Sequence, residues 1–267
     1  MSFSHKKHLG QNFLKDTLIK DRIFLSIPSF AKDLQIVEIG TGLGDLTQRL
    51  LDFGKVVTYE IDKDLEAPLR SKFDSALKDG SLEIRFKNIM DSKDTNIFEG
   101  DYFLVANLPY YVATAFILKA LKDKNCKGFL VMIQKEVALK FCALSGQKEF
   151  CALSVLSQSL GEIKYLFDVE ASCFEPVPKV DSAVIYFVKT KSFISDLESL
   201  LRQAFKSPRK MLFKNLEIDK KELEEVFIKL NLSLQIRPHQ VSTDTYIDLL
   251  NQLQKVGKWK TTTKEVT

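Results

Sequence analysis

Short apolar runs rich in β-branched residues alternate with stretches of helical periodicity through the first two thirds of the chain. The apolar runs predict strands at residues 35–39, 55–60, 82–86, 102–106, 128–134, 163–169 and 182–188. Amphipathic patterns at 45–53 and 114–122 predict helices between the earlier strands. Strands that alternate with helices favour a doubly wound α/β domain with a mostly parallel sheet.

The last two predicted strands are connected differently from the others. Only residues 173–181 separate them, and this connection contains two prolines. It is too short to hold a crossover helix, which a parallel pair requires. The pattern therefore predicts an antiparallel hairpin at one edge of the sheet.

The pattern becomes helical beyond residue 188. Amphipathic helices are predicted at 196–205, 219–230 and 243–256, with breaks at Pro208 and Pro238. We therefore predict two domains, an α/β domain at residues 1–190 and a small all-helical domain at residues 191–267.

Composition excludes several classes of protein. The purely apolar runs, such as residues 129–133, are far shorter than the roughly 20 residues that a membrane span needs. No apolar segment follows the basic start of the chain, which argues against a secretory signal and predicts a cytoplasmic protein. The four cysteines lack paired spacing and there are only three histidines, so no metal site is expected.

Positive charge is concentrated at the carboxyl end of the chain. The net charge is +4, and the residues from Lys189 onward carry 15 Lys and Arg against 10 Asp and Glu. This excess suits a polyanionic partner, although a solvated helical surface explains it equally well.

A glycine-rich loop, Gly40-Thr41-Gly42-Leu43-Gly44, follows the first strong strand and precedes a helix. Glycines allow a sharp turn and the close approach of a ligand to the backbone. The spacing is G-x-G-x-G after an acidic residue, whereas the dinucleotide fingerprint is G-x-G-x-x-G. It favours an adenosyl ligand with an amino-acid tail over a nicotinamide dinucleotide, and a turn without a ligand is a further alternative.

Glu60 ends the next strand, 20 residues after Gly40. An acidic side chain at this place can accept hydrogen bonds from both ribose hydroxyls of an adenosine. It supports an adenosine-containing ligand without distinguishing one donor from another.

The tetrapeptide Asn107-Leu108-Pro109-Tyr110 directly follows the apolar strand 102–106. Ligands of open α/β sheets bind outside the carboxyl ends of the strands, so these residues should face the ligand. The lone pair of adenine N6 is delocalised, and acceptors for its two N–H groups favour a more tetrahedral nitrogen. The Asn107 oxygen and the Leu108 carbonyl suit that role, Pro109 fixes the turn, and Tyr110 offers a stacking face. The pattern predicts methyl transfer to an adenine amino group.

Phe174 lies in the connection of the terminal hairpin. It suits two roles equally: closing the pocket opposite Tyr110, which would imply a base removed from its stack, or packing in the core.

These motifs together resemble the KsgA/RsmA family of small-subunit ribosomal RNA adenine N6,N6-dimethyltransferases. The resemblance rests on residues 7–14 (Lys-His-Leu-Gly-Gln-Asn-Phe-Leu), the glycine loop, residues 107–110 and residues 174–182, and it covers nearly the whole chain. It implies a class I, Rossmann-like methyltransferase sheet with S-adenosylmethionine as methyl donor. The substrate would be two adjacent adenosines in a hairpin loop near the 3′ end of 16S rRNA, within the assembling small (30S) subunit. Nothing in the sequence demands more than a monomer, which is the state we expect.

The resemblance also implies roles for single residues. Asn12 and Leu14 would contact the donor, Gly40 and Gly42 would approach its amino-acid end, and Glu60 would bind its ribose. The family usually has an Asp for the donor's adenine amino group, and Asn88 stands there in this chain, with Asp91 as the alternative. RNA contacts would come from Lys6, Lys7, Lys206, Arg209 and Lys210, although the family's pair of arginines is reduced here to Arg209.

Three alternatives remain at this point. A related 23S rRNA adenine methyltransferase shares the glycine loop and the Asn-x-Pro-Tyr type of motif. A ribosome-binding assembly factor or transcription factor on the same scaffold would bind without much catalysis. A nicotinamide-dependent enzyme would share the glycine loop and the acidic residue after it.

Overall fold

The computed structural model describes residues 12–91, 96–257 and 259. The chain divides into two compact units, Met1–Ala138 with Lys164–Lys189, and Leu139–Ile163 with Thr190–Thr267. None of the helices in the described part combines the length and apolar character needed to cross a membrane.

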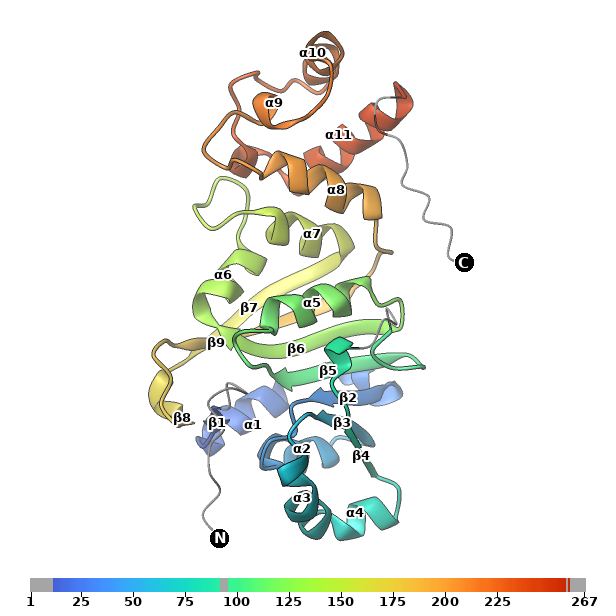
Figure 1. Cartoon of the computed structure of the whole chain (residues 1–267), viewed down its shortest axis with the longest axis vertical. Coiled ribbons are helices and arrows are strands. Elements are labelled where there is room, and N and C mark those ends of the chain that lie inside the picture. Colours follow the sequence, from blue (N-terminus) through green and yellow to red (C-terminus); the bar gives the residue numbers. More distant parts are fainter. Residues whose placement is uncertain (1–11, 92–95, 258, 260–267) are drawn as a thin grey trace. The chain divides into compact units, whose positions relative to one another are not determined.

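The first unit is organised on a seven-stranded sheet in the order β4-β3-β2-β5-β6-β9-β7 (Figure 1). The strands are β2 (Gln35–Ile39), β3 (Val56–Glu60), β4 (Leu82–Phe86), β5 (Tyr102–Asn107), β6 (Cys126–Gln134), β7 (Gly161–Val169) and β9 (Ser182–Lys189). Strands β2 to β6 pair in parallel, and β9 is antiparallel to β6. Strand β7 forms the edge beside β9. The predicted strands and the mostly parallel sheet with a terminal hairpin are therefore confirmed.

The order of the strands reverses between β2 and β5, which are neighbours although β3 and β4 lie between them in the sequence. Such a switch point leaves a crevice outside the carboxyl ends of the two strands, where ligands of open α/β sheets bind.

The helices of this unit are α1 (Thr17–Leu25), α2 (Asp45–Leu51), α3 (Glu66–Lys72), α4 (Asp74–Lys78), α5 (Ala113–Lys122) and the start of α6 (Lys135–Cys142). Helix α5 shows why the helices could be predicted from the spacing of apolar residues. Its buried side chains follow the spacing i, i+3, i+4, i+7 and i+8, which forms one apolar face; they are Ala113, Phe116, Ile117, Ala120 and Leu121.

A second sheet, which the sequence did not predict, consists of two short strands. Strand β1 (Phe13–Leu14) pairs antiparallel with β8 (Phe174–Glu175), and Leu14 lies opposite Phe174. This pair holds the segment before α1 against the connection between β7 and β9. Two-residue strands are too short to produce a recognisable periodicity.

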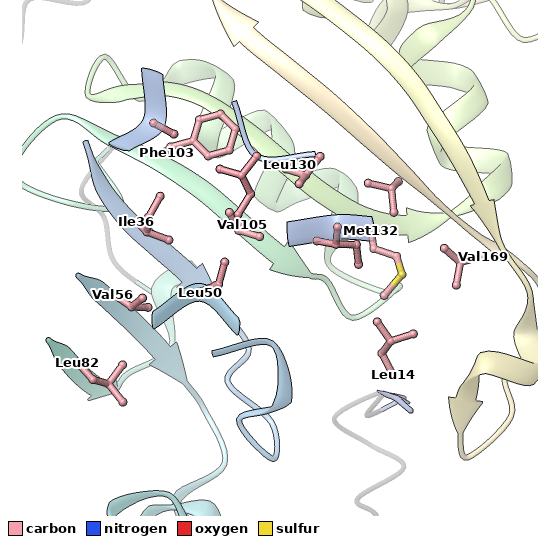
Figure 2. Packing of buried hydrophobic residues seen from close by; sticks show 14 of the residues in the cluster. Leu14, Ile36, Leu50, Val56, Leu82, Phe103, Val105, Leu130, Met132 and Val169 are labelled. Carbon is pink, nitrogen blue, oxygen red and sulfur yellow. The ribbon is translucent and has the colours of Figure 1, made fainter. Parts of the chain in front are cut away.

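The core of the first unit packs around the central strands. Phe103 and Val105 of β5 and Leu130 and Met132 of β6 belong to one buried cluster (Figure 2). The cluster extends to Leu14, so the amino-terminal strand is part of the core.

Gly128 lies in β6, where there is no space for a side chain. A Cβ at this position would collide with the carbonyl oxygen of Phe187 and come within 2.9 Å of the Phe103 ring. We expect Gly128→Ala to lower the free energy of unfolding by roughly 3 kcal/mol because the sheet must shift to accept a methyl group. Gly54→Ala is the matched control, since nothing lies within 4 Å of its Cβ. Urea denaturation measures both variants, and equal stabilities would contradict the packing described here.

The second unit is helical apart from the first residues of β7. Its helices are α7 (Ala152–Leu160), α8 (Ser195–Ala204), α9 (Leu212–Asn215), α10 (Lys220–Lys229) and α11 (Thr243–Lys255). Residues 139–163 belong to this unit because α7 packs with α8 and α11. One such contact is the hydrogen bond that Thr243 donates to Gln158 at 2.7 Å. The sequence had placed this segment in the first domain, since its partners α8 and α11 lie beyond β9 in the chain.

Candidate active site

The candidate site lies where β2, β3 and β5 end. These neighbouring strands carry the glycine loop, Glu60 and Asn107 at their carboxyl ends. A pocket of about 180 Å³ opens among them. Its wall combines the segment before α1, the ends of the three strands and the start of α5; the residues are Asn12, Phe13, Ile39, Gly40, Gly42, Tyr59, Glu60, Ile61, Lys87, Asn88, Ile89, Met90, Asn107, Leu108, Pro109, Tyr110, Tyr111, Val112 and Phe116.

The glycine loop has the conformation that its sequence predicts. Gly40 and Gly42 have φ values of 80° and 55°, in the left-handed region that L side chains rarely adopt. A Cβ on Gly42 would also come within 3.0 Å of the Phe13 ring. Both glycines line the pocket, so the loop presents backbone to a ligand.

Glu60 fixes this loop from the neighbouring strand. One carboxylate oxygen accepts from the Gly42 N–H at 2.8 Å, and the other accepts from Ile61 and Asp62, each at 2.8 Å. The side chain is 5% exposed and lines the pocket. An ionised carboxylate has about four acceptor sites, so it can also accept from a ribose.

Asn107 has a defined orientation. Its Nδ2 donates to the Asn12 carbonyl at 3.1 Å, which leaves the Oδ1 end of the amide to accept from a ligand. The Leu108 N–H donates to Met132 in β6 at 3.1 Å, and the Val112 N–H donates to the Pro109 carbonyl at 3.2 Å. The turn is therefore fixed at both ends, and Leu108 lines the pocket beside Asn107.

Tyr110 ends the turn of residues 107–110, and Tyr111 follows it. The Tyr110 hydroxyl hydrogen-bonds the Ser182 hydroxyl at 2.8 Å, and this half-buried ring lines the pocket. Burial raises the Tyr110 pKa. Tyr111, which the sequence analysis missed, also lines the pocket and is 63% exposed.

Phe174 lies in the core. It is 3% exposed, belongs to the buried cluster together with Leu14, and is not among the described residues that line the pocket. Of the two roles that the sequence left open, the structure favours packing over a stacking face.

Asn88 lines the pocket, and its Oδ1 accepts from the Met90 N–H at 3.0 Å. Asp91 is not among the described lining residues. The position after β4 therefore presents an amide to the pocket.

The structure describes three of the five basic residues suggested for RNA contact. Lys6 and Lys7 lie outside the described residues. In the second unit, Arg209 and Lys210 are exposed between α8 and α9, and Lys206 pairs with Glu217 at 2.8 Å. An exposed pair of this kind contributes little to stability and can exchange with a phosphate.

Glu38, the acidic residue before the glycine loop, is fully buried. Desolvation by burial raises its pKa from 4.5 to about 8, against the opposing effect of hydrogen bonds such as the one Thr47 donates at 2.7 Å. This burial was not predicted from the sequence, because an acidic residue beside a loop is usually exposed.

Glu38 should make stability depend on pH. Its pKa is higher in the folded state, so the folded chain binds the proton more tightly, and the free energy of unfolding should fall as pH rises from 4.5 to about 8. Glu38→Gln keeps the shape of the protonated acid and removes the titration. Urea unfolding across this pH range should show a smaller loss of stability in the variant, whereas identical profiles would refute the assignment.

Comparison with known proteins supports one family over the whole chain. The sequence profile of the ribosomal RNA adenine dimethylase family matches residues 2–255. Ribosomal RNA small subunit methyltransferase A of Helicobacter hepaticus is 47% identical over 264 residues, covering 95% of this chain and 93% of the relative. The protein of the same name from Sulfurimonas denitrificans is 47% identical, covering 98% and 97% of the two chains.

Solved structures support the fold. A dimethyladenosine transferase from Plasmodium falciparum superposes with a TM-score of 0.77 at 23% identity, covering 91% of this chain and 98% of the other. The 23S rRNA methyltransferase ErmE gives 0.72 at 22% identity, covering 91% and 99%. At identities this low, the two superpositions support the methyltransferase fold and do not assign a substrate. Through its profile match and its 47% identical relatives, this chain belongs to the ribosomal RNA adenine dimethylase family.

Proposed function

We propose that this chain transfers methyl groups from S-adenosylmethionine to N6 of two adjacent adenosines in a loop near the 3′ end of 16S rRNA, converting each to N6,N6-dimethyladenosine. The observation that carries the proposal is the Asn-Leu-Pro-Tyr turn of residues 107–110 in the wall of the pocket beside the glycine loop. The names of the relatives favour the small subunit as the substrate.

The residues present fit an adenosyl donor. The Gly40 and Gly42 backbone and the buried Glu60 carboxylate line one pocket, so adenosine and a tail without phosphate suit it better than a diphosphate. In our proposal Glu60 accepts from the ribose hydroxyls and Asn88 accepts from the adenine amino group. Bound S-adenosylmethionine supplies a methyl group already activated by its sulfonium.

Asn107 positions the accepting nitrogen and is not a general base. With its Nδ2 held by Asn12, its Oδ1 accepts one N6–H, and the Leu108 carbonyl accepts the other. These two bonds favour a tetrahedral N6 whose lone pair is directed at the methyl group. The activated donor removes the need for a strong base, and the surplus N6 proton leaves to water.

Tyr110 provides the stacking face for the base. Its hydrogen bond to Ser182 fixes the ring in the pocket wall, where an unstacked adenine can lie against it. Phe174 is assigned to the core, because its ring belongs to the buried cluster and the residue does not line the pocket.

The second methyl transfer to each adenosine meets a different nitrogen. A monomethylated N6 has one N–H group, so Asn107 and the Leu108 carbonyl cannot both accept from it. The pocket must therefore hold the monomethylated adenosine mainly through stacking of its base and through contacts to the neighbouring nucleotide.

The helical unit is proposed to bind RNA. Its exposed Arg209 and Lys210 suit phosphates, and we assign Lys206 and the amino-terminal Lys6 and Lys7 to the same role. The protein would act as a cytoplasmic monomer on the assembling subunit, without a membrane partner, and contribute to subunit biogenesis.

Transfer of labelled methyl groups tests this proposal. Under-methylated small subunits should accept label from S-adenosylmethionine, and large-subunit RNA should accept none. Label in large-subunit RNA alone would establish the ErmE-like alternative. Thermal stabilisation by S-adenosylhomocysteine and none by NAD is expected as well, and the reverse would indicate a nicotinamide enzyme.

A further inference from the structure

A smaller pocket of about 50 Å³ adjoins the main one at the glycine loop. The two share the lining residues Phe13, Gly40, Gly42 and Asn107. The smaller pocket adds two charged residues, Lys20 from α1 and Asp45 from the start of α2. Neither residue belongs to a motif recognised in the sequence.

Lys20 is unusually buried for a lysine. Its side chain is 13% exposed, and its Nζ lies 3.8 Å from the nearer Asp45 oxygen, beyond hydrogen-bond distance. The ammonium carries three N–H donors, and this contact satisfies none of them by geometry. A charge withdrawn from water in this way requires a close counter-charge, since desolvation of an ammonium is unfavourable.

The neighbouring cations are held more closely than Lys20. Arg49 lies 2.7 Å from Asp21. Lys72 donates to the Leu43 carbonyl at 2.7 Å and lies 3.3 Å from the other Asp45 oxygen. Asp45 therefore divides its charge between two lysines, and Lys20 is the more distant of them. An additional anion in the smaller pocket would give the Lys20 ammonium the close counter-charge that Asp45 supplies only at a distance.

The proposed donor supplies such an anion. Its adenosine belongs in the main pocket with Glu60, and its amino-acid end carries a carboxylate and an ammonium group. The smaller pocket begins at the glycine loop and offers one cation and one anion. This arrangement is complementary to a zwitterion.

We propose that Lys20 is the counter-ion of the carboxylate at the amino-acid end of the methyl donor, with Asp45 facing the ammonium of the same group. The inference rests on the proposed function, because it takes S-adenosylmethionine as the ligand. Lys20 touches the donor away from the methyl group, so it contributes to donor affinity and to discrimination against adenosine ligands without the amino-acid end.

Calorimetric titration with two ligands tests the proposal. S-adenosylhomocysteine carries the amino-acid end, whereas 5′-methylthioadenosine keeps the adenosine and the sulfur and lacks that end. We expect Lys20→Met to weaken S-adenosylhomocysteine binding about tenfold, the effect of losing one charged hydrogen bond. Binding of 5′-methylthioadenosine should stay within about twofold, which also shows that the adenosine pocket of the variant is folded.

Lys78→Met is the matched control. It removes the same charge from an exposed lysine that pairs with Asp74 on the surface, and it should change neither affinity. Equal losses for both ligands in Lys20→Met, or a loss for neither, would overturn the role of Lys20. If the unaltered protein binds neither ligand, the proposed function itself fails.

Discussion

Replacing Asn107 by alanine is expected to lower methyl transfer to small subunits by about a hundredfold to a thousandfold, the usual effect of removing one aligned polar group from a transition state. The variant loses the Oδ1 acceptor for N6, and it also loses the Nδ2 bond to the Asn12 carbonyl. Binding to the subunit should persist, because it depends on a larger surface. Single-turnover transfer of labelled methyl and a filter-binding titration measure the two quantities separately.

Asn125→Ala provides the control for Asn107. Asn125 is also an asparagine of the first unit with structural hydrogen bonds, since its Nδ2 donates to the Phe98 carbonyl at 2.9 Å, but it does not line the pocket. We expect that variant to lose stability and keep its rate. If Asn107→Ala loses binding and transfer in parallel, Asn107 is structural and the mechanism is wrong. Persistent binding with unchanged transfer would equally contradict it.

Glu60→Ala should have the largest effect on donor binding. The affinity for S-adenosylhomocysteine is expected to fall by at least about a hundredfold, because two hydrogen bonds from ribose to a charged acceptor are lost. The same change removes the acceptor of the Gly42, Ile61 and Asp62 N–H groups, so the glycine loop should loosen. The free energy of unfolding should fall with it. Calorimetric titration and urea denaturation report the two effects.

Glu60→Gln separates these effects. The amide keeps one oxygen and replaces the other with a donor, so it cannot satisfy both Gly42 and the Ile61–Asp62 pair. We expect an affinity between those of the unaltered protein and the alanine variant. Unchanged donor affinity in both variants would remove Glu60 from the site.

Periodicity was sufficient for the sheet and for the principal helices. Strands β2 and β4 have the predicted bounds. The mostly apolar run of β2 is typical of a buried parallel strand, and the alternation of apolar and charged residues in β4 is typical of a half-buried strand. Gly40 follows β2, and Glu60 and Asn107 end β3 and β5, so the parallel arrangement of these strands predicted that the three residues lie at one edge of the sheet. All three line the pocket.

Features that depend on contacts between residues far apart in the chain could not be predicted from periodicity. The pairing of Leu14 with Phe174 joins segments 160 residues apart, and it explains why the Phe174 ring is buried. Residues 139–163 join the second unit through partners on α8 and α11. Likewise, Lys20 lies on a helix outside the motifs recognised in the sequence, and only the folded chain shows that it lines one pocket together with the glycine loop.

The identity of the methylated nucleoside tests the central claim most directly. Small subunits methylated by this protein should be digested to nucleosides and separated by chromatography, with the modified positions mapped on the RNA. The account predicts N6,N6-dimethyladenosine at two adjacent positions of the 3′ hairpin loop, and far less of it in the same reaction time with Asn107→Ala. Methyl groups on a ribose, on a ring carbon or on another base would contradict it.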